Sequence, residues 1–529
     1  MAVTQKSNQN IILTAMILAV SMTTIDQTIV ALSADTIQSG LGISHAAMTW
    51  SVNAYLLATA AFFMLGGRLA DVFGHKRMAI IGIIGFALCS LLCGLTPSGN
   101  IADTWLITAR AVQGFFTALM FPAALGIVLA SFSEQGRGKA MATFFGITGA
   151  VTAIGPILGG DLTEWTWRSI FFINLPIALL ALVLIARQYV PETRVNAPID
   201  WKGAATVALG MGLAVCGLQQ AGTWGWNSAL TWAFIVCGLA FLGIFVLLEE
   251  KVRYPLLRIG LFKSRAFSLS TIAVIFASMA FIPIFFFMSV YAQISLGLSV
   301  NQTGLLLLEF FIGFVIASRY GGQIFDKHGA RIPLLAGGAL GAAAFAWWAT
   351  KLGELQDGGA FFSSPQFWPT VLAGAGLGLM FSAAATDIAN RGGAQAYGAS
   401  TGISQTAKNL GGAVGLAIFS ALLATQLNAN LTQSFTALGA SATDASAVAQ
   451  NINSGQQSSQ SSGDFDKLPP PVQKEFKDAV RTSYANANKP VFYGMSATMA
   501  IVFVMGLLYP HTTAQEKAAR KVGGVSLAT

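Results

Sequence analysis

Three charged side chains lie deep within long apolar stretches of the sequence: Asp26, Arg110 and Glu309. A charge near the centre of a bilayer costs about 2.5–3.5 kcal/mol on insertion scales, so it usually faces a cavity or a partner of opposite sign. Asp26 and Arg110 fall at similar depths, roughly 10 Å from the outer ends of their stretches at the rise of an α-helix. An ion pair across a central cavity is therefore geometrically allowed. Its roles could be proton transfer or static packing of two helices, and Glu309 is a candidate for the first role on the same argument.

A short polar turn, GRLADVFGHKR over residues 67–77, separates two apolar stretches. Its glycines, Gly67 and Gly74, allow close approach of the backbone. Asp71 is the one acid in the turn, and the bases around it include Arg77. A turn of this kind between two membrane spans predicts a hinge on the cytoplasmic side.

A weaker copy of this turn occurs far downstream. Gly322, Asp326 and Gly329 repeat the spacing of Gly67, Asp71 and Gly74, and Arg331 follows the last glycine as Arg77 follows its own. Each copy comes after the second span of a similar block. The two copies together predict a duplicated half.

The elements that must position these residues are membrane spans. Hydrophobic residues make up 54% of the 529-residue chain and charged residues only 10%, against roughly 25% in soluble proteins. We expect an all-α polytopic membrane protein with fourteen spans, since each apolar run is about 20 residues long. The runs cover residues 10–33, 48–67, 78–95, 104–130, 140–160, 169–189, 203–221, 229–248, 267–291, 303–325, 332–350, 367–389, 398–426 and 491–510.

The distribution of Lys and Arg predicts the orientation. Turns after even-numbered runs carry most of the bases, so both termini are expected to be cytoplasmic, in a multi-pass protein of the cell membrane. The net charge of +8 then reflects this rule and predicts no nucleic-acid partner. No cofactor or metal is expected either, because the cysteines lie inside apolar runs and all four histidines, His75 among them, are interpreted as solvated turn or tail residues.

The segment 427–489 is rich in Ser, Gln, Asn and Ala, and the topology predicts that it is an extracytoplasmic loop. Beyond its run of prolines, apolar residues recur every four positions at Val472, Phe476, Val480 and Tyr484. This is one face of an amphipathic helix, which could rest on the membrane surface or on the outer rim of the protein. A lid or a partner-binding site is the alternative.

Five motifs together resemble the major facilitator superfamily, and within it the fourteen-helix drug:proton antiporters of the EmrB/QacA type. The turn at 67–77 resembles the superfamily signature between helices 2 and 3. The others resemble motifs of helices 1, 4, 5 and 6 and read DQTIV at 26–30, RAVQG at 110–114, GPILGG at 155–160 and WRSIFFINLP at 167–176. The sequence departs from the family pattern at Ser33, Val151, Glu309 and Lys408.

The resemblance implies two pseudo-symmetric six-helix bundles, over 10–189 and 267–510, with a linker at 190–266 that carries two inserted spans and a cytoplasmic tail at 511–529. It implies alternating access around a site near the midplane. Asp71 would cap the N-terminus of the thirteenth span in the outward-open state. The helix-5 motif of antiporters would comprise Gly155, Pro156, Gly159 and Gly160.

The predicted function is that of a secondary transporter and not of an enzyme, since neither a nucleophile motif nor a phosphate loop occurs in the sequence. We expect a proton-coupled exporter of hydrophobic or amphipathic compounds, cations included, with protons and membrane lipid as partners and a periplasmic adaptor left open. The alternative is an exporter or flippase of a lipid or lipid-like metabolite. Candidates for substrate contact are polar and aromatic side chains of the spans: Asn53, Gln113, Phe285, Tyr291, Glu309 and Phe310.

Overall fold

The computed structural model describes residues 2–191, 194–354, 364–393, 396–438, 446, 448–449 and 470–510, and within these residues the regular structure is entirely helical. The first half contains α1 (Ala2–Leu32), α2 (Ala34–Leu41), α3 (His45–Phe73), α4 (His75–Gly94), α5 (Ala102–Ser131), α6 (Glu134–Trp165), α7 (Ser169–Phe172) and α8 (Asn174–Ala186). The rest contains α9 (Trp201–Trp224), α10 (Ala229–Glu249), the short 3-10 helix η1 (Ile259–Lys263), α11 (Arg265–Ile294), α12 (Val300–His328), α13 (Arg331–Lys351), α14 (Phe367–Gly392), α15 (Tyr397–Ala437) and α17 (Pro470–Leu508).

Thirteen spans of the described part are long and apolar enough to cross a membrane. The fifth predicted run lies in α6, a helix of 32 residues that packs against α1 and α12. The sixth predicted run is divided between α7 and α8, with a break at Ile173. The prediction of an all-α multi-pass membrane protein is thus confirmed.

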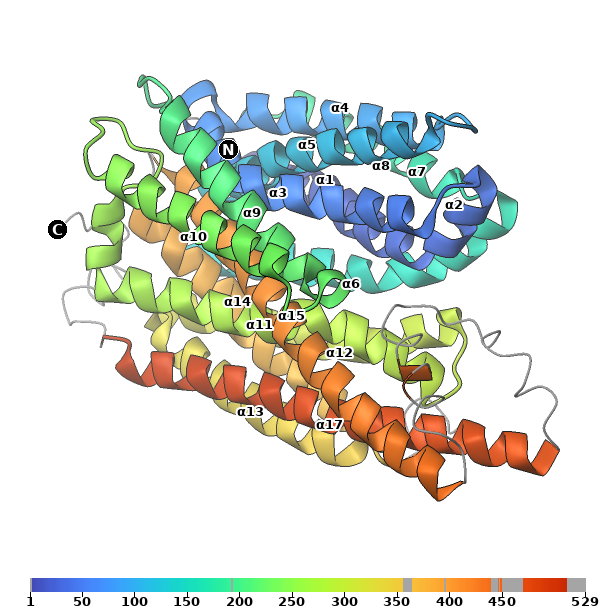
Figure 1. Ribbon diagram of the computed structural model, residues 1–529. Helices are drawn as coiled ribbons and strands as arrows, with labels where there is room; N and C mark the ends of the chain where they lie inside the picture. The colour runs from blue at the N-terminus through green and yellow to red at the C-terminus, as the bar shows by residue number, and fades with distance from the viewer. Residues whose placement is uncertain are drawn as a thin grey trace.

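The helices form two groups that lie side by side (Figure 1). Helices α1 to α8 make up one group, and α11 to α17 make up the other. Helices α9 and α10 pack against each other, and α9 contacts α3 of the first group and α15 of the second. The inserted pair therefore lies against the join between the two groups.

Glycine ends the second span of each group. Gly74 follows α3 with a φ of 99°, and Gly329 follows α12 with a φ of 81°. Side chains rarely adopt such angles, so glycine is favoured at both sites. The repeated spacing in the sequence thus corresponds to a repeated backbone conformation.

The predicted loop at 427–489 is shorter in the structure. Helix α15 continues to Ala437, and α17 begins at Pro470 and runs without a break into the last span. The predicted amphipathic face packs on the protein and not on a membrane surface, because Phe476 lies 5.0 Å from Phe435 of α15 between ring centroids. The Arg481 backbone carbonyl also accepts a hydrogen bond from Ser295, at the end of α11. Residues 439–445, 447 and 450–469 lie outside the described part, as does the predicted tail at 511–529.

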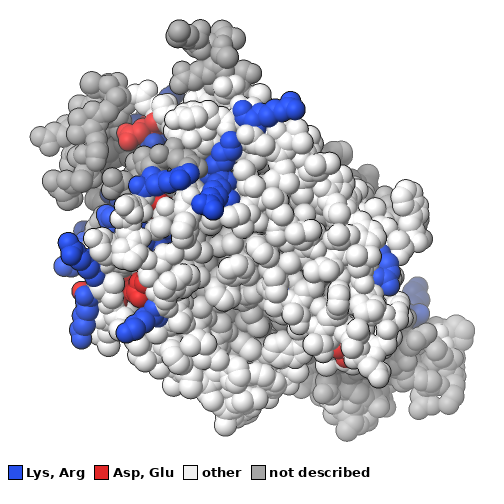
Figure 2. Space-filling view, turned by 90° about the horizontal axis from the view of Figure 1, so that it is seen from above, with Lys and Arg blue, Asp and Glu red and all other residues white. Residues whose placement is uncertain are grey.

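Charge is unevenly distributed along the helices. Figure 2 shows most of the visible Lys and Arg side chains toward one end of the molecule, beside a broad surface without charged residues. The start of α1 and the end of α17 lie toward that same end in Figure 1. This end is the one that the sequence predicts to be cytoplasmic.

Candidate functional site

Asp26 and Arg110 form an ion pair inside the first helix group. One Arg110 terminal nitrogen donates to Oδ2 of Asp26 and also, over 2.8 Å, to Oε1 of Gln113. Oδ1 of Asp26 accepts hydrogen bonds from the amides of Gln113 and Asn174, over 3.2 and 3.3 Å. Asp26 is 0% exposed and Arg110 1%. The pair lies within one helix group, whereas the sequence allowed it to bridge a central cavity.

An aromatic side chain connects this pair to the space between the groups. The Arg110 guanidinium lies over the Tyr55 ring, 4.4 Å from its centroid. The Tyr55 hydroxyl is hydrogen-bonded to the Thr117 hydroxyl, with 3.0 Å between the oxygens. Because Thr117 lines the central cavity, a continuous set of contacts joins the ion pair to the cavity wall.

That cavity has a volume of about 220 Å³ and lies between the two helix groups. Its wall combines Phe rings of α11, α12 and α14 with Thr and Gln side chains of α1, α3, α5 and α6. Lys408 of α15 is the one ionisable side chain among its described lining residues. The ammonium group lies 5.1 Å from the Phe281 ring centroid and 6.0 Å from that of Phe381. The cavity is thus largely apolar with one cationic group, which suits an amphipathic ligand.

Of the six predicted substrate contacts, Phe285 lines this cavity. Gln113 instead belongs to the Asp26 network. Phe310 packs behind the wall, 5.7 Å from Phe285 between centroids. The Tyr291 hydroxyl donates to the Leu352 carbonyl and accepts from Gln366, so Tyr291 has a structural role. Asn53 and Glu309 are not among the lining residues.

Glu309 is completely buried in α12. Within the described part of the chain, neither carboxylate oxygen has a hydrogen-bond partner. The next turn of α12 packs tightly on α14, where a side chain on Gly313 would overlap the Val371 backbone. Glu309 is therefore separate from both the Asp26 network and the cavity lining.

The predicted hinge residue Asp71 connects the two helix groups. The Asp71 carboxylate accepts hydrogen bonds from the backbone amides of Gly398 and Ala399, over 2.7 and 2.8 Å. These amides belong to the first turn of α15, where N–H groups lack helical partners and the helix dipole favours an anion. Side chains on Gly67 and Gly398 would each overlap the other's carbonyl oxygen, so glycine at both positions permits the contact. The cap implied by the family resemblance is present.

The copy of this turn makes a related contact in the opposite direction. The Asp326 carboxylate of α12 accepts hydrogen bonds from the amides of Gly138 and Lys139 in α6, over 2.9 and 3.1 Å. A side chain on Gly322 would overlap the Gly138 carbonyl, as at Gly67. In each contact, an acidic side chain of one helix group thus accepts hydrogen bonds from a helix of the other group. We name the two contacts the Asp71 clamp and the Asp326 clamp.

The prediction that His75 is a solvated turn residue is wrong, because its side chain is buried (3% exposed). Its Nε2 lies 3.4 Å from the Asp71 carboxylate, and its ring packs against Gly126 of α5. Arg77, which follows it, is exposed.

The predicted antiporter motif lies in α6. A side chain on Gly155 would overlap Thr28, and one on Gly159 would contact Ile29. Gly155 therefore allows α6 to pack closely on α1 at Thr28, a residue of the cavity wall, whereas the space beside Gly159 would accommodate a Cβ. Pro156 and Gly160 fall within the same helix.

Most residues of the cavity wall were not predicted from the sequence. Gln405, Lys408, Asn409 and Gly412 share one face of α15, and all four line the cavity. Their spacing of three and four residues was a usable signal, since a polar face on an apolar span usually faces a cavity or another helix. Gln27 of α1, part of the DQTIV motif, and Gln219 of α9 also line it, and Gln219 does not stand out in the sequence.

A buried ion pair, a cavity between two helix groups and reciprocal contacts between the groups are features that a membrane transporter can combine. The sequence model of the Major Facilitator Superfamily matches residues 12–416. The chain belongs to this superfamily.

The curated relatives include drug and antibiotic exporters. The chain is 33% identical over 419 residues to the tetracenomycin C resistance and export protein of Streptomyces glaucescens, which covers 78% of this chain and 76% of the relative. It is 27% identical to multidrug resistance protein 3 of Bacillus subtilis (strain 168), over 97% of this chain and 98% of the relative. Both agree with the resemblance found in the motifs.

Among solved structures, the human organic anion transporter MFSD10 (TETRAN) superposes with a TM-score of 0.55 and 12% identity, over 95% of this chain and 99% of the other. At this identity the likeness concerns the fold alone.

Proposed function

We propose that this protein is a proton-coupled exporter of hydrophobic or amphipathic small molecules, which it carries across the cell membrane by alternating access. The observation that supports this most is the buried Asp26–Arg110 pair, joined through Tyr55 and Thr117 to the cavity between the helix groups. The drug and antibiotic exporters among the relatives support the substrate class.

Asp26 is the proposed proton carrier. Its buried carboxylate accepts hydrogen bonds from Arg110, Gln113 and Asn174. Protonation would remove the charge and weaken the hold on Arg110, which also lies over the Tyr55 ring. Movement of Arg110 would then shift Tyr55 and Thr117 at the cavity wall. Proton binding and substrate binding are coupled in this scheme because they act on one network.

The two clamps are the proposed switch. Both close the end that is predicted to be cytoplasmic, so we assign this conformer to the part of the cycle that is closed toward the cytoplasm. Opening on that side requires both carboxylates to leave their helix amides. Gly67, Gly74 and Arg77 belong to the turn that carries Asp71 and are proposed to act with the Asp71 clamp. Both chain termini are proposed to be cytoplasmic.

The charge of the cavity lining favours neutral or acidic substrates. Lys408 is its only ionisable residue within the described lining, so a cationic ligand would be repelled and an acidic group attracted. This refines the expectation from sequence, which included cations. The volume of about 220 Å³ is below the roughly 300–1,000 Å³ of typical ligand pockets, so substrate loading requires the groups to move apart.

A lipid substrate, the second hypothesis from sequence, has no support from the relatives described above. We keep proton-driven export of small molecules as the single proposal and leave open any adaptor protein outside the membrane.

Reconstituted vesicles test the proposal. The purified chain is placed in liposomes, a pH gradient is imposed, and transport is followed for matched aromatic compounds that are neutral, acidic or cationic. We expect gradient-driven transport of neutral and acidic compounds, which stops when an ionophore dissipates the gradient. Transport that is unchanged by the ionophore would contradict proton coupling, and preference for the cationic compound would contradict the role of Lys408.

A further inference from the structure

A third contact joins the two helices that the clamps hold. The guanidinium carbon of Arg137 in α6 lies over the ring of Tyr397 in α15, 5.1 Å from its centroid. Arg137 directly precedes Gly138 and Lys139, which supply the two amides of the Asp326 clamp. Tyr397 directly precedes the two amides of the Asp71 clamp. The two side chains thus occupy matching positions near the starts of α6 and α15.

The Arg137 side chain is fixed on both sides of the boundary between the groups. Its Nε donates to the backbone carbonyls of Leu129 and Phe132, at the end of α5, over 2.9 and 3.3 Å. One terminal nitrogen donates to Oδ1 of Asn390 in α14, over 3.1 Å. The side chain is only 12% exposed. Arg137 therefore bridges the groups through a hydrogen bond as well as through its contact with the Tyr397 ring.

The aromatic partner is also shielded from water. Tyr397 is the first residue of α15 and is 4% exposed. A guanidinium over an aromatic ring is attracted by the negative face of the ring, and this attraction grows when the contact is desolvated. The contact between Arg137 and Tyr397 thus stabilises the conformer in which the starts of α6 and α15 lie together.

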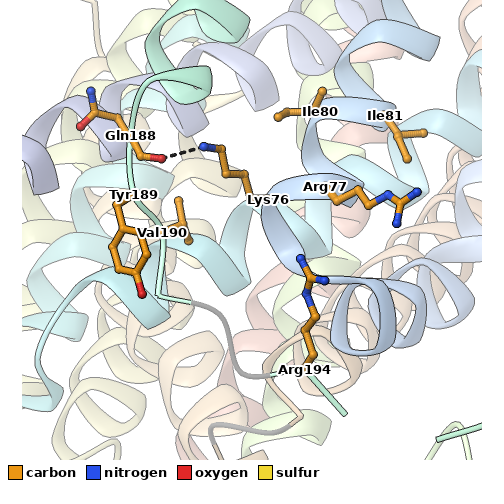
Figure 3. Close-up of a pocket in the computed structure, with 8 residues that line it drawn as sticks. All are labelled: Lys76, Arg77, Ile80, Ile81, Gln188, Tyr189, Val190 and Arg194. Carbon is orange, nitrogen blue, oxygen red and sulfur yellow. Dashed lines mark hydrogen bonds between the residues drawn. The ribbon is translucent and has the colours of Figure 1, made fainter. Parts of the chain in front are cut away.

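The turn that carries Asp71 is anchored within the first group. Lys76, at the start of α4, donates to the backbone carbonyls of Ala186 and Gln188 over 3.0 and 2.7 Å, and Figure 3 shows it pointing toward Gln188. The Asp71 carbonyl accepts a hydrogen bond from the backbone N–H of Val195, over 3.0 Å. Because these bonds fix the turn, we expect the Asp71 clamp to open by movement of the start of α15.

We propose that Arg137 and Tyr397 are positioning residues that make the two clamps open together. Without their contact, each clamp joins one pair of helices, α3 with α15 and α12 with α6. With it, the start of α15 is held by Asp71 and Arg137, and the start of α6 is held by Asp326 and Tyr397. Movement of either helix away from its carboxylate therefore strains the contact that holds the other helix. The inference rests on the proposed role of the clamps as the switch, and it gives that switch two states where independent clamps would have four.

Two pairs of spin labels follow the clamps separately. Ser133 and Lys327 are exposed and lie beside the two sides of the Asp326 clamp. Phe73 and Arg265 are exposed and lie at the end of α3 and the start of α11. Helix α11 packs on α15, so this second pair follows the Asp71 clamp. Distances are recorded for the full chain in detergent, without substrate or a pH gradient.

The Asp71→Asn variant then shows whether the second clamp follows the first. With Arg137 and Tyr397 present, we expect both distances to lengthen in the same fraction of molecules. In Tyr397→Leu/Asp71→Asn, the lengthened fraction at Ser133–Lys327 should fall roughly threefold or more below that at Phe73–Arg265, as the loss of a cation–π contact allows. Equal fractions in this double variant would overturn the proposal.

Two other results of the same measurement are also decisive. Lengthening of the Phe73–Arg265 pair alone while Tyr397 is present would show that the clamps are independent, which overturns the proposal. Lengthening of neither pair in Asp71→Asn would refute the clamps as a switch, and the inference would fall with it. Because the distances require no transport, either result is distinct from a failure of proton-coupled export in vesicles.

Three further variants, each combined with Asp71→Asn, assign the effect to the contact itself. Tyr397→Phe keeps the ring and should keep the clamps coupled. Arg137→Gln removes the cation and should uncouple them, which decides the question if Tyr397→Leu does not fold; coupling retained in Arg137→Gln would contradict the proposal. Glu134→Gln removes an exposed acid 3.8 Å from the Arg137 guanidinium and should change nothing. Uncoupling by Tyr397→Phe or Glu134→Gln would indicate a general disturbance of these helix starts and would also overturn the proposal.

Discussion

In the first helix group, the charge buried at mid-span is paired, since Asp26 contacts Arg110 and two amide side chains. In the second group, Glu309 and Lys408 have no ionic partner within the described part of the chain. A buried pair depends on both of its members, because the loss of one leaves an uncompensated charge. A buried charge without a partner is available to a ligand of opposite charge, or else it destabilises the fold. In the proposed mechanism, the first group therefore couples to protons and the second group supplies selectivity.

The strongest test of this comparison removes Arg110. Arg110→Met leaves the Asp26 carboxylate buried and unpaired, so we expect destabilisation by about 3–5 kcal/mol. Lys408→Met removes a cation without an ionic partner and should cost much less. Thermal unfolding of both variants in the same detergent measures the difference. Equal destabilisation would contradict the assignment of paired and unpaired charge to the two groups.

A double variant sharpens this test. Asp26→Leu/Arg110→Met replaces the pair with apolar side chains, and such replacements of buried ion pairs are often neutral or stabilising. We expect the double variant to regain most of the lost stability but not gradient-driven transport. Recovery of both would show that the pair has only a structural role.

The two clamps provide the next comparison. Asp71 is 0% exposed and accepts from the first turn of α15, whereas Asp326 is half-buried. Because hydrogen bonds to charged groups contribute about 1.5–3 kcal/mol, Asp71→Asn should shift the conformer equilibrium by roughly tenfold or more. Asp326→Asn should shift it less. Both variants should fold and should transport more slowly than wild type.

The shift toward the conformer with open clamps can be measured as a longer distance between spin labels at Ser133 and Lys327. Both residues are exposed, and they lie on different helix groups. The background variant is Cys237→Ser, since Cys237 is the exposed member of the four cysteines. A larger shift for Asp326→Asn than for Asp71→Asn would reverse the ranking of the clamps.

Selectivity should respond to Lys408. Lys408→Gln removes the cation of the cavity and keeps a polar side chain of similar length. We expect affinity for acidic substrates to fall about tenfold, while affinity for neutral ones changes little. Equilibrium binding to the detergent-purified variant measures both. A uniform loss for acidic and neutral ligands would indicate that Lys408 shapes the cavity without reading charge.

The smallest effect is expected at Glu309. Glu309→Gln replaces a buried carboxyl without hydrogen bonds by an amide of similar size. Because Glu309 lines neither the cavity nor the Asp26 network, transport rate should stay within about twofold of wild type, and stability should not fall. A loss of proton-driven transport in this variant would restore Glu309 as a coupling acid, as its place in the sequence suggested.

Features carried by local patterns could be predicted from sequence. The spans follow from runs of apolar residues. The glycines of the duplicated turn permit a positive-φ backbone conformation, which both copies adopt. The depths of Asp26 and Arg110 allowed their pairing, which the structure contains. The contact of Asp71 with the start of α15 followed from the family resemblance.

Features that depend on how helices face one another could not be predicted. Gln219 lies on an inserted helix, and only the docking of α9 against α3 and α15 brings it to the cavity. Glu309 has the burial expected of a coupling acid, but it is not among the residues that line the cavity. His75 follows a polar turn in sequence, and the packing of α4 on α5 buries it. The separation between α15 and α17 was overestimated because polar composition resembles a loop even where the helices continue.

The central claim is that Asp26 couples the proton gradient to export, and Asp26→Asn tests it most directly. Wild type and variant are placed in matched vesicles, and one acidic or neutral substrate is followed in two modes: transport driven by a pH gradient, and exchange of labelled for unlabelled substrate without a gradient. We predict that Asp26→Asn loses gradient-driven transport and retains exchange, because the cavity is intact while the proton carrier is absent. Gradient-driven transport at the wild-type rate in Asp26→Asn would contradict the account.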